Sequence, residues 1–302
     1  MLPTRNGVGP SVITLPVGDW LLVIDFLVQR FDAIPREEWQ ARMQNDLVMD
    51  ENGLSVYPDR PHQAHLKIFY YRSIENEIPI PFEESILFQD EHLIIADKPH
   101  FLPVMPAGIY LQETLLVRLK RNTGIETLVP MHRIDRETAG IVVFVIKPET
   151  RGAYQSLFLS KRVEKCYQAI APYRNDLAFP VTYKSRLQES GNFMQMEEAE
   201  GDANSETIIE VLEQRDNLAR YQLKPVTGKK HQLRAHMAAL GIPILNDLIY
   251  PVHRPTDQDD YNKPLQLLAQ QIAFVDPITG ERRTFESKQV LVLSGGSTNA
   301  QW

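Results

Sequence analysis

The feature that most constrains this chain is an uninterrupted apolar run at positions 141–146, IVVFVI, which directly follows the polar stretch 131–140, MHRIDRETAG. A short continuous apolar run is typical of a buried β-strand. The polar stretch places one acid, Asp135, close to two arginines, Arg133 and Arg136. Because ionised side chains are costly to place beside a buried strand, their concentration here predicts an active site.

Asp135 is expected to be ionised at neutral pH, since neighbouring positive charge favours a carboxylate. An ionised carboxylate can act as a nucleophile and form a covalent intermediate at an electrophilic carbon. Alternate residues of an extended segment point to opposite sides, so Arg133 and Asp135 are expected to face one cleft while Ile134 packs inward. The structural alternative is a polar turn that caps the strand, with Asp135 paired to Arg133 or Arg136.

The segment 132–140, HRIDRETAG, closely resembles the H-R-L-D-x-x-T-S-G motif of the RluA-type RNA pseudouridine synthases. Ile134 stands for Leu and Ala139 for Ser, and neither position bears the chemistry. The resemblance implies that Asp135 is the catalytic residue. It also implies that Arg133 fills the space left by the flipped-out target base.

Two further segments extend the resemblance. The stretch 97–104 is similar to the family's D-K-P-x-G-L-x-V motif, with Phe101 in place of a Gly that would supply backbone freedom. The alternating strand expected at 163–170 resembles the K-x-Y-x-A segment, in which the Tyr stacks on the uracil and has been assigned a base role. That position is Tyr167 here, and an aromatic face with a polar end suits a splayed-out base. The alternative for Tyr167 is an ordinary core aromatic.

The segment 228–236, GKKHQLRAH, resembles the family's G-R-x-H-Q-I-R-x-H motif. The resemblance implies that Arg234 pairs with the catalytic Asp and that Leu233 packs under the base. Lys229 replaces an Arg, which keeps the charge and loses the bidentate geometry. With Lys165 and Lys230, Lys229 is expected to contact the RNA backbone.

Two histidines in this segment raise the alternative of a metal site. His231 and His236 are five residues apart, so they do not share a helix face as ligands at i and i+4 do, and no third acidic ligand stands at a fixed spacing. No metal is therefore expected. The next segment, 241–250, matches the family's G-x-P-I-x-G-D-x-x-Y, with Asn246 at a Gly position where a positive φ is tolerated.

Length and composition fit this interpretation. A chain of 302 residues predicts about two domains. The single cysteine, Cys166, excludes an internal disulfide framework and favours a cytoplasmic protein. No targeting or membrane-spanning segment is expected. The net charge of −7 argues against a general nucleic-acid coat, but the acid is concentrated in the stretch 197–202, expected to be a solvated loop, whereas basic residues fall near the motifs.

The expected fold is of the α+β class, with a mixed, mainly antiparallel sheet and flanking helices in the catalytic domain at 84–290. A small N-terminal α/β module is expected at 1–75, a linker at 76–83 and a flexible tail at 291–302. The module's expected order is a helix at 20–31 capped by Asp19, a helix from Pro35 to Met43, a hairpin around Asn52 and Gly53, and a strand at 65–71. This order resembles the small RNA-binding domain of many relatives, and the alternative is a structural extension.

The sequence thus predicts isomerisation of uridine to pseudouridine in structured RNA, with ribosomal RNA favoured over transfer RNA. No cofactor is expected, since the family uses none, and a monomer is the family expectation. Two other classes are considered. One is an inactive RNA-binding protein of the same fold, and the other is a glycoside hydrolase, which requires a second carboxylate about 5–9 Å from Asp135.

Overall fold

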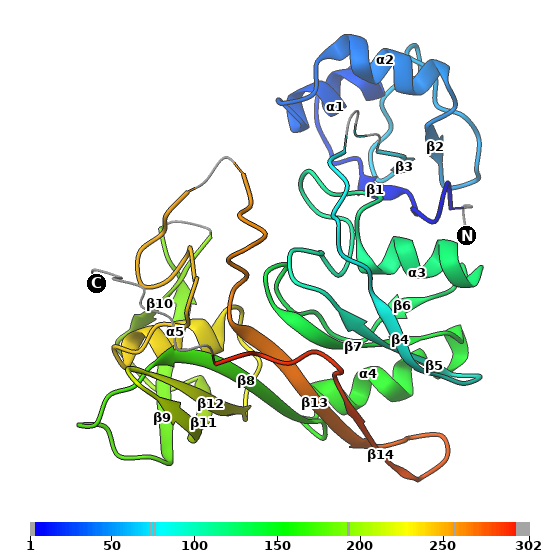
Figure 1. Cartoon of the computed structure of the whole chain (residues 1–302). Helices are drawn as coiled ribbons and strands as arrows, with labels where there is room; N and C mark the ends of the chain where they lie inside the picture. The colour runs from blue at the N-terminus through cyan, green and yellow to red at the C-terminus, as the bar shows by residue number, and fades with distance from the viewer. Residues whose placement is uncertain (1–3, 73, 75–76, 192–193, 256–257, 294–302) are drawn as a thin grey trace. The chain divides into compact units, whose positions relative to one another are not determined.

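The computed structural model describes residues 4–72, 74, 77–191, 194–255 and 258–293, and the chain divides into two compact units. The first unit consists of Met1–Pro79 and Met105–Glu126, and the second of Ile80–Val104 and Thr127–Trp302 (Figure 1). The division after Pro79 falls inside the stretch expected to be a linker. The segment Met105–Glu126, expected in the catalytic domain, clusters with the first unit instead.

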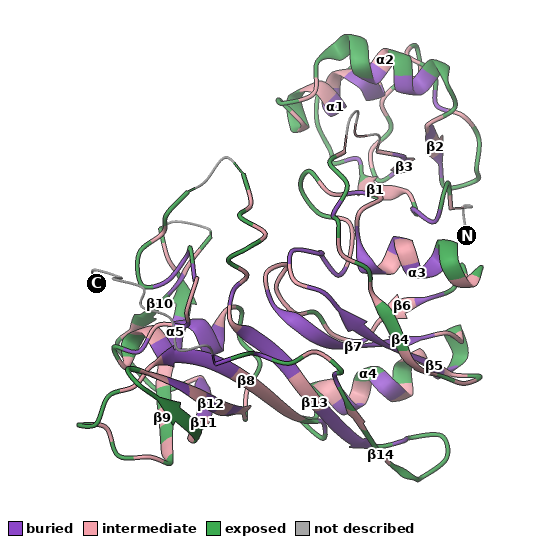
Figure 2. Cartoon of the chain, in the orientation of Figure 1, coloured by how far each residue is buried: buried purple, intermediate pink, exposed green. Residues whose placement is uncertain are grey.

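The first unit has a three-stranded antiparallel sheet in the order β1 (Ser11–Thr14), β3 (Lys67–Tyr70) and β2 (Val48–Asp50). Helices α1 (Val23–Arg30) and α2 (Arg36–Gln44) bury apolar side chains against it. Trp39 of α2 is fully buried in this core, beside Ile24 and Ile68. The unit therefore has a hydrophobic core of its own (Figure 2).

Local details of the first unit differ from expectation. Helix α1 begins three residues later than expected and Leu22, not Asp19, is its N-cap, because the backbone at Leu22 and Val23 pairs with residues 60 and 61. The hairpin at Asn52 and Gly53 forms, but its two arms share a single isolated β-bridge, between Met49 and Ser55, and do not form a regular two-stranded ladder. The main partner of β2 is β3.

Helix α3 (Leu115–Thr123) completes the first unit. Its N-cap Thr114 accepts a hydrogen bond from the backbone of Val117, as the cap residue of a helix commonly does. Just before it, the carboxylate of Glu77 accepts three successive backbone N–H groups, from residues 111, 112 and 113. Glu77 therefore ties the segment that precedes Pro79 to the start of α3.

The second unit is built on one eleven-stranded sheet, and its α+β class confirms the expected fold. Nine strands follow one path, in the order β10-β9-β11-β12-β8-β13-β7-β5-β4, while β14 pairs with β13 and β6 with β7. All of these pairings are antiparallel except that of β7 with β13. The strands are β4 (Ser85–Gln89), β5 (Leu93–Lys98), β6 (Val129–Pro130), β7 (Ala139–Val145), β8 (Glu164–Pro172), β9 (Val181–Glu189), β10 (Met196–Ala199), β11 (Ser205–Arg215), β12 (Leu218–Pro225), β13 (Leu267–Val275) and β14 (Arg282–Glu286).

The apolar run at the centre of the sequence forms β7, and every residue of that strand is buried. Helix α4 (Arg151–Leu159), preceded by the short 3-10 helix η1 (Pro148–Thr150), places Tyr154 and Leu157 against the same core as Ile141, Val143 and Val145. Helix α5 (Gln232–Ala239) packs near β9, β10 and β11. The parallel contact between β7 and β13 therefore joins two antiparallel halves of the sheet, and the stretch that carries Asp135 enters β7 at that junction.

Two expectations for the second unit were wrong in part. The acidic stretch from residue 197 is not all loop, because residues 196–199 form β10, which pairs with β9 at the edge of the sheet. Leu291 and Leu293, placed in the expected flexible tail, are buried against Ala139 and Leu268. Residues 294–302 of that tail lie outside the described residues. The part of the chain that the structure describes contains no helix with the length and hydropathy of a membrane span.

Candidate active site

Asp135 and Arg234 meet in the second unit although 99 positions separate them in the chain. Nη1 of Arg234 donates to Oδ2 of Asp135 over 3.0 Å. The Asp135 side chain keeps 27% of its surface exposed, whereas that of Arg234 keeps 1%. The carboxylate is therefore reachable from solvent while its cationic partner is enclosed in protein.

The remaining nitrogens of Arg234 are held by a second carboxylate, Asp247. Nε donates to Oδ2 over 2.8 Å and Nη2 to Oδ1 over 2.7 Å, which is the planar fork geometry that arginine offers to a carboxylate. Oδ1 of Asp247 also accepts the backbone N–H groups of Ile249 and Tyr250. Although burial opposes the charge, Asp247, Asp135 and Glu137 raise the pKa of Arg234 above its usual range, so the guanidinium stays charged.

His231 lies on the other oxygen of Asp135. Its Nε2 is 3.8 Å from Oδ1 of Asp135, and its Nδ1 is 3.3 Å from the hydroxyl of Tyr250. His231 has a positive φ of 51° at the start of α5. Burial lowers its pKa, and Arg234 and Lys230 act in the same direction, whereas Asp135 and Asp247 oppose the shift. The imidazole is therefore neutral at physiological pH.

The structural alternative was that Asp135 pairs with Arg133 or Arg136. The ion pairs of Arg136 are instead made with Asp259 and Glu137. Arg136 forms a bidentate ion pair with Asp259, at 2.7 and 2.8 Å, and its Nε donates to Glu137 over 3.0 Å. Glu137 also lies 3.9 Å from Nη1 of Arg234. Asp135 is therefore available to pair with Arg234. Two further carboxylates, Glu137 and Asp247, also lie next to Arg234.

Tyr167 and Leu233, the two residues expected to hold the base, lie in one apolar cluster of the second unit. Tyr167 comes from β8 and Leu233 from the first turn of α5, and Leu233 is 8% exposed. Burial raises the pKa of the Tyr167 phenol, and the charge of Asp135 raises it further. The raised pKa keeps the phenol protonated at neutral pH.

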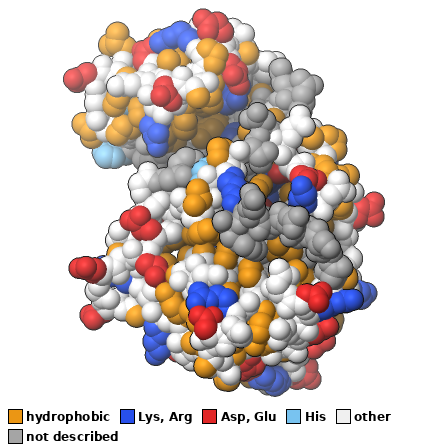
Figure 3. Space-filling view, turned by 60° about the vertical axis from the view of Figure 1, so that its left-hand side comes forward, with side chains coloured by type: hydrophobic (Ala, Val, Ile, Leu, Met, Phe, Trp, Pro, Cys, Tyr) orange, Lys and Arg blue, Asp and Glu red, His pale blue; other side chains and the backbone are white. Residues whose placement is uncertain are grey.

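Four basic residues were expected to contact the target RNA. Arg133 is exposed and makes no hydrogen bond or ion pair with any residue that the structure describes. Lys165 is half-buried, its pKa is lowered by burial, and its charge acts on His132. Lys229 and Lys230 are exposed in the turn before α5. On the face drawn in Figure 3, Lys and Arg side chains are interspersed with Asp and Glu.

The first motif supports the turn that carries Asp135. Nζ of the fully buried Lys98 donates to the carbonyls of Pro99, Leu102 and Arg136 at 3.0, 2.7 and 3.0 Å. Burial lowers the pKa of Lys98 to about 7, against the opposing influence of Glu137 and Asp135. Phe101, at the family's glycine position, adopts a φ of 65°, so the loop keeps a left-handed conformation without the glycine.

The remaining histidines of the motifs have structural contacts. Nε2 of His132 accepts the backbone N–H of Val143 over 3.2 Å, and burial lowers its pKa to about 3. His236 is fully buried between Thr207 and Ser205, at 2.9 Å from each hydroxyl. Among the described residues, no three His, Cys, Asp or Glu side chains are arranged to hold a metal ion.

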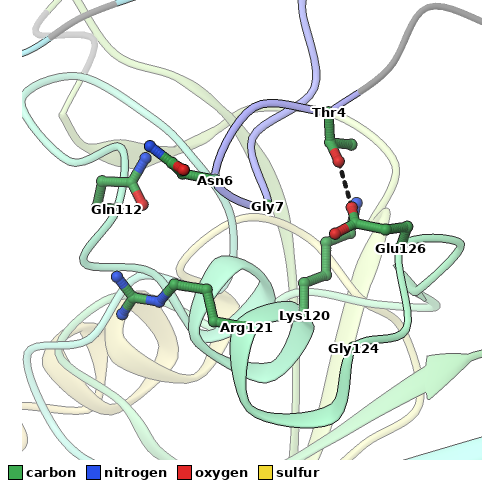
Figure 4. Close-up of a pocket in the computed structure, with 8 residues that line it drawn as sticks. All are labelled: Thr4, Asn6, Gly7, Gln112, Lys120, Arg121, Gly124 and Glu126. Carbon is green, nitrogen blue, oxygen red and sulfur yellow. Dashed lines mark hydrogen bonds between the residues drawn. The ribbon is translucent and has the colours of Figure 1, made fainter.

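A pocket of about 500 Å³ lies in the first unit and belongs to a different part of the molecule (Figure 4). Polar and charged side chains surround it, and Thr4 donates a hydrogen bond to Glu126 there. Its lining residues are Thr4, Asn6, Gly7, Gln112, Lys120, Arg121, Gly124 and Glu126. None of the residues that sequence analysis assigned to the catalytic site lines this pocket.

Sequence analysis gave no role to Asp247 and Tyr250 and considered His231 only as a metal ligand. Asp247 and Tyr250 did stand inside a recognised segment, 241–250, so their positions carried a signal. The signal did not say what they contact, because the ion pair of Asp247 with Arg234 joins two segments that fold back on each other.

Comparisons with known proteins show which family the chain resembles. A family model described as RNA pseudouridylate synthase matches residues 92–239. The dual-specificity RNA pseudouridine synthase RluA of Haemophilus influenzae is 33% identical over 225 residues, which cover 71% of this chain and 97% of that protein. The tRNA pseudouridine(31) synthase of Saccharomyces cerevisiae is 25% identical over 282 residues, covering 78% of this chain and 69% of that protein.

A solved structure shows a similar fold. Human RNA pseudouridylate synthase domain containing 1 superimposes with a TM-score of 0.57 at 20% identity, covering 68% of this chain and 84% of that one. The fold thus agrees with the sequence relationship. The chain belongs to the RluA-type RNA pseudouridine synthase family, and its activity is that of an RNA pseudouridine synthase.

Proposed function

We propose that this protein converts specific uridines of a structured RNA to pseudouridine, with Asp135 as the catalytic carboxylate. The observation that carries the proposal is the ion pair of Asp135 with Arg234, whose guanidinium is itself clamped by Asp247. A preorganised charge of this kind needs no rearrangement when the reaction begins. The hydrolase alternative is set aside because the chain belongs to the synthase family.

Two first steps are compatible with this carboxylate. In one, an oxygen of Asp135 forms a bond to C1′ as the C1′–N1 bond breaks, and the electron pair leaves on uracil N1. In the other, Asp135 takes the proton from C2′, a C1′–C2′ double bond forms, and the same electron pair leaves with the uracil. The base then rotates and its C5 bonds to C1′. In the first route the bond between Asp135 and C1′ breaks as this bond forms, and in the second Asp135 returns the proton to C2′. The hydrogen at C5 leaves as a proton in either route. Neither route changes the oxidation state or consumes energy, so the proposal includes no cofactor.

The target uridine must leave its stack before Asp135 reaches it, at a cost of a few kcal/mol. Arg133 is exposed and has no hydrogen-bond or ion-pair partner among the described residues, so its side chain is suited to fill the vacancy in the RNA. Tyr167 and Leu233, in one apolar cluster, are suited to hold the flipped base between them. Because burial and Asp135 raise the pKa of Tyr167, we assign the phenol a stacking role and not that of a resting base.

Lys165, Lys229 and Lys230 are proposed to contact phosphates, with the first unit adding RNA contacts of its own. We keep ribosomal RNA as the preferred substrate class, and the yeast relative named as a tRNA synthase makes transfer RNA the alternative to test beside it. We also propose that the enzyme is a monomer and acts in the cytoplasm.

The experiment measures tritium release from RNA labelled at uracil C5, using ribosomal and transfer RNA that lack the modification. We expect release by the wild-type protein, none by Asp135→Asn, and wild-type release by Asp176→Asn, an exposed aspartate paired with Arg174. Full activity of Asp135→Asn would refute the catalytic assignment. If the wild-type protein binds these RNAs but releases no tritium, the protein is an inactive RNA-binding member of the fold.

A further inference from the structure

The two oxygens of Asp135 have different surroundings. Oδ2 is bound at 3.0 Å by the charged guanidinium of Arg234, which withdraws electron density from it. Oδ1 has no donor at hydrogen-bond distance among the described residues, and the nearest ring nitrogen, Nε2 of His231, is 3.8 Å away. Oδ1 is therefore the more nucleophilic and more basic of the two oxygens.

The contacts of Tyr250 favour one tautomer of His231. The hydroxyl oxygen of Tyr250 already accepts the backbone N–H of Met196 over 2.7 Å, and its own O–H is available to donate to Nδ1 of His231 at 3.3 Å. In a neutral imidazole the remaining proton then lies on Nε2. The Nε2–H group faces Oδ1 of Asp135.

Tyr250 also contacts Arg234, which binds Oδ2 of Asp135. The guanidinium carbon of Arg234 lies 5.6 Å from the centre of the Tyr250 ring, and the backbone N–H of Tyr250 donates to Asp247. The ring of His231 meets the Tyr250 ring edge to face, with centroids 5.8 Å apart. One tyrosine thus orders the groups on both sides of the Asp135 carboxylate.

We propose that Oδ1 is the reacting oxygen of Asp135 and that His231, oriented by Tyr250, is the positioning residue that aims it at the sugar of the target uridine. This proposal rests on the proposed catalytic role of Asp135. Oδ1 either forms the bond to C1′ or takes the C2′ proton, while the electron pair of the C1′–N1 bond leaves with the uracil. At 3.8 Å the neutral Nε2–H dipole attracts Oδ1 without forming a hydrogen bond in the free protein, and it lacks the full positive charge that would quench the reactivity of the carboxylate.

The left-handed backbone of His231 makes the proposal testable. Asn tolerates a positive φ better than Gln does, whereas only Gln carries an N–H group near the position of the histidine Nε2. A purely structural role of His231 therefore predicts that His231→Asn is the milder change. The positioning role predicts the reverse, with His231→Gln the milder change for catalysis.

The experiment measures single-turnover tritium release, RNA affinity and unfolding midpoint for His231→Asn, His231→Gln, Tyr250→Phe and Asp135→Asn. We expect His231→Gln to stay within about threefold of the wild-type rate, and His231→Asn to lose at least about tenfold, as for loss of one oriented polar group. RNA affinity should change less than about twofold. His65 also has a positive φ, is exposed and lies in the first unit, so His65→Asn and His65→Gln serve as matched controls with wild-type rates.

A second readout is the pH profile. The groups whose charge acts on His231 are Asp135, Asp247, Arg234 and Lys230, and Tyr250 binds its Nδ1. Protonation of His231 would create an ion pair with Oδ1, so the wild-type rate should fall on the acid side, and this fall should shrink in His231→Gln. If Asp135→Asn is inactive but His231→Asn has the wild-type rate, the proposal about His231 is wrong. If Asp135→Asn is fully active, the proposed function itself is wrong.

Discussion

Asp247 holds Arg234 by both carboxylate oxygens, at 2.7 and 2.8 Å, with exposed side-chain fractions of 0% and 1%. Only Nη1 of the guanidinium is left to donate to Asp135. The guanidinium of Arg234 next to Asp135 is thus held in place by Asp247, which lies 112 positions after Asp135 in the chain.

Replacing Asp247 by Asn should destabilise the protein by about 3–5 kcal/mol, because it leaves a buried guanidinium without its main counter-charge. Tritium release should fall as well, because Arg234 loses its orientation. Urea unfolding measures the first effect. Glu164→Gln is the control, since Glu164 also binds an arginine, Arg282, by both carboxylate oxygens but on an exposed surface, and it should leave the midpoint unchanged. Equal effects of the two variants would contradict the prediction.

Arg234→Lys should lower the single-turnover rate about 10²-fold while the affinity for RNA changes little. Lysine keeps the positive charge, but a single ammonium does not bind Asp247 in a planar fork and donate to Asp135 at the same time. Single-turnover rates over a range of enzyme concentrations separate the two quantities. Arg282→Lys, on the exposed ion pair, is expected to behave as the wild type. A rate for Arg234→Lys within threefold of the wild type would show that charge alone is sufficient.

His236 should make stability fall in acid. Burial lowers its pKa to about 4 from an ordinary value of 6.5, so the unfolded chain takes up a proton in a pH range where the folded protein does not. The corresponding stability is fully present above pH 6.5 and is lost as pH falls towards 4, amounting to about 3 kcal/mol at most. His236→Gln should therefore show a weaker pH dependence of its urea midpoint between pH 7 and 4, whereas exposed His65→Gln should keep the wild-type dependence.

Gly140→Ala should be strongly destabilising. A Cβ at this position would lie 2.3 Å from the carbonyl oxygen of Ala269, and the φ of 109° is unfavourable for alanine. The clash falls at the parallel contact of β7 with β13, so activity should fall with stability. Gly152→Ala is the control, because this glycine lies in α4 with open space around it, and alanine there should stabilise the protein by about 0.5–1 kcal/mol. A tolerated Gly140→Ala would mean that the two strands separate easily.

Phe101→Gly sets two effects against each other. Glycine would relieve the positive φ of 65°, a gain of about 1 kcal/mol. The change also removes a buried ring that contacts Phe82 and Tyr261, with centroids at 6.1 and 5.1 Å, and such a loss costs about 3–5 kcal/mol. The expected net effect is a destabilisation of about 2–4 kcal/mol in urea unfolding. An increase in stability would show that the backbone conformation is the larger factor.

Several strands of the second unit and the candidate site residues could be predicted from local sequence alone. The run at 141–146 predicted a buried strand because apolar continuity reports burial directly. The motif resemblance selected Asp135, Arg234, Tyr167 and Leu233, and the structure brings Asp135 and Arg234 into contact and places the other two in one cluster. Motif residues are recognisable because their spacing along the chain is fixed.

The orientation of these side chains depends on contacts between segments that are distant in the chain. Helix α1 begins at Val23 and not at residue 20, because the backbone at Leu22 and Val23 pairs with residues 60 and 61. This pairing outweighs the local capping preference for Asp19. Asp247 and His231 acquired their partners because the tertiary fold brings α5, the segment after it and the turn that carries Asp135 together. Hydrogen bonds and ion pairs act over a few ångströms, whereas the residues that form them lie far apart in sequence, so local pattern carries no information about which pairs will meet.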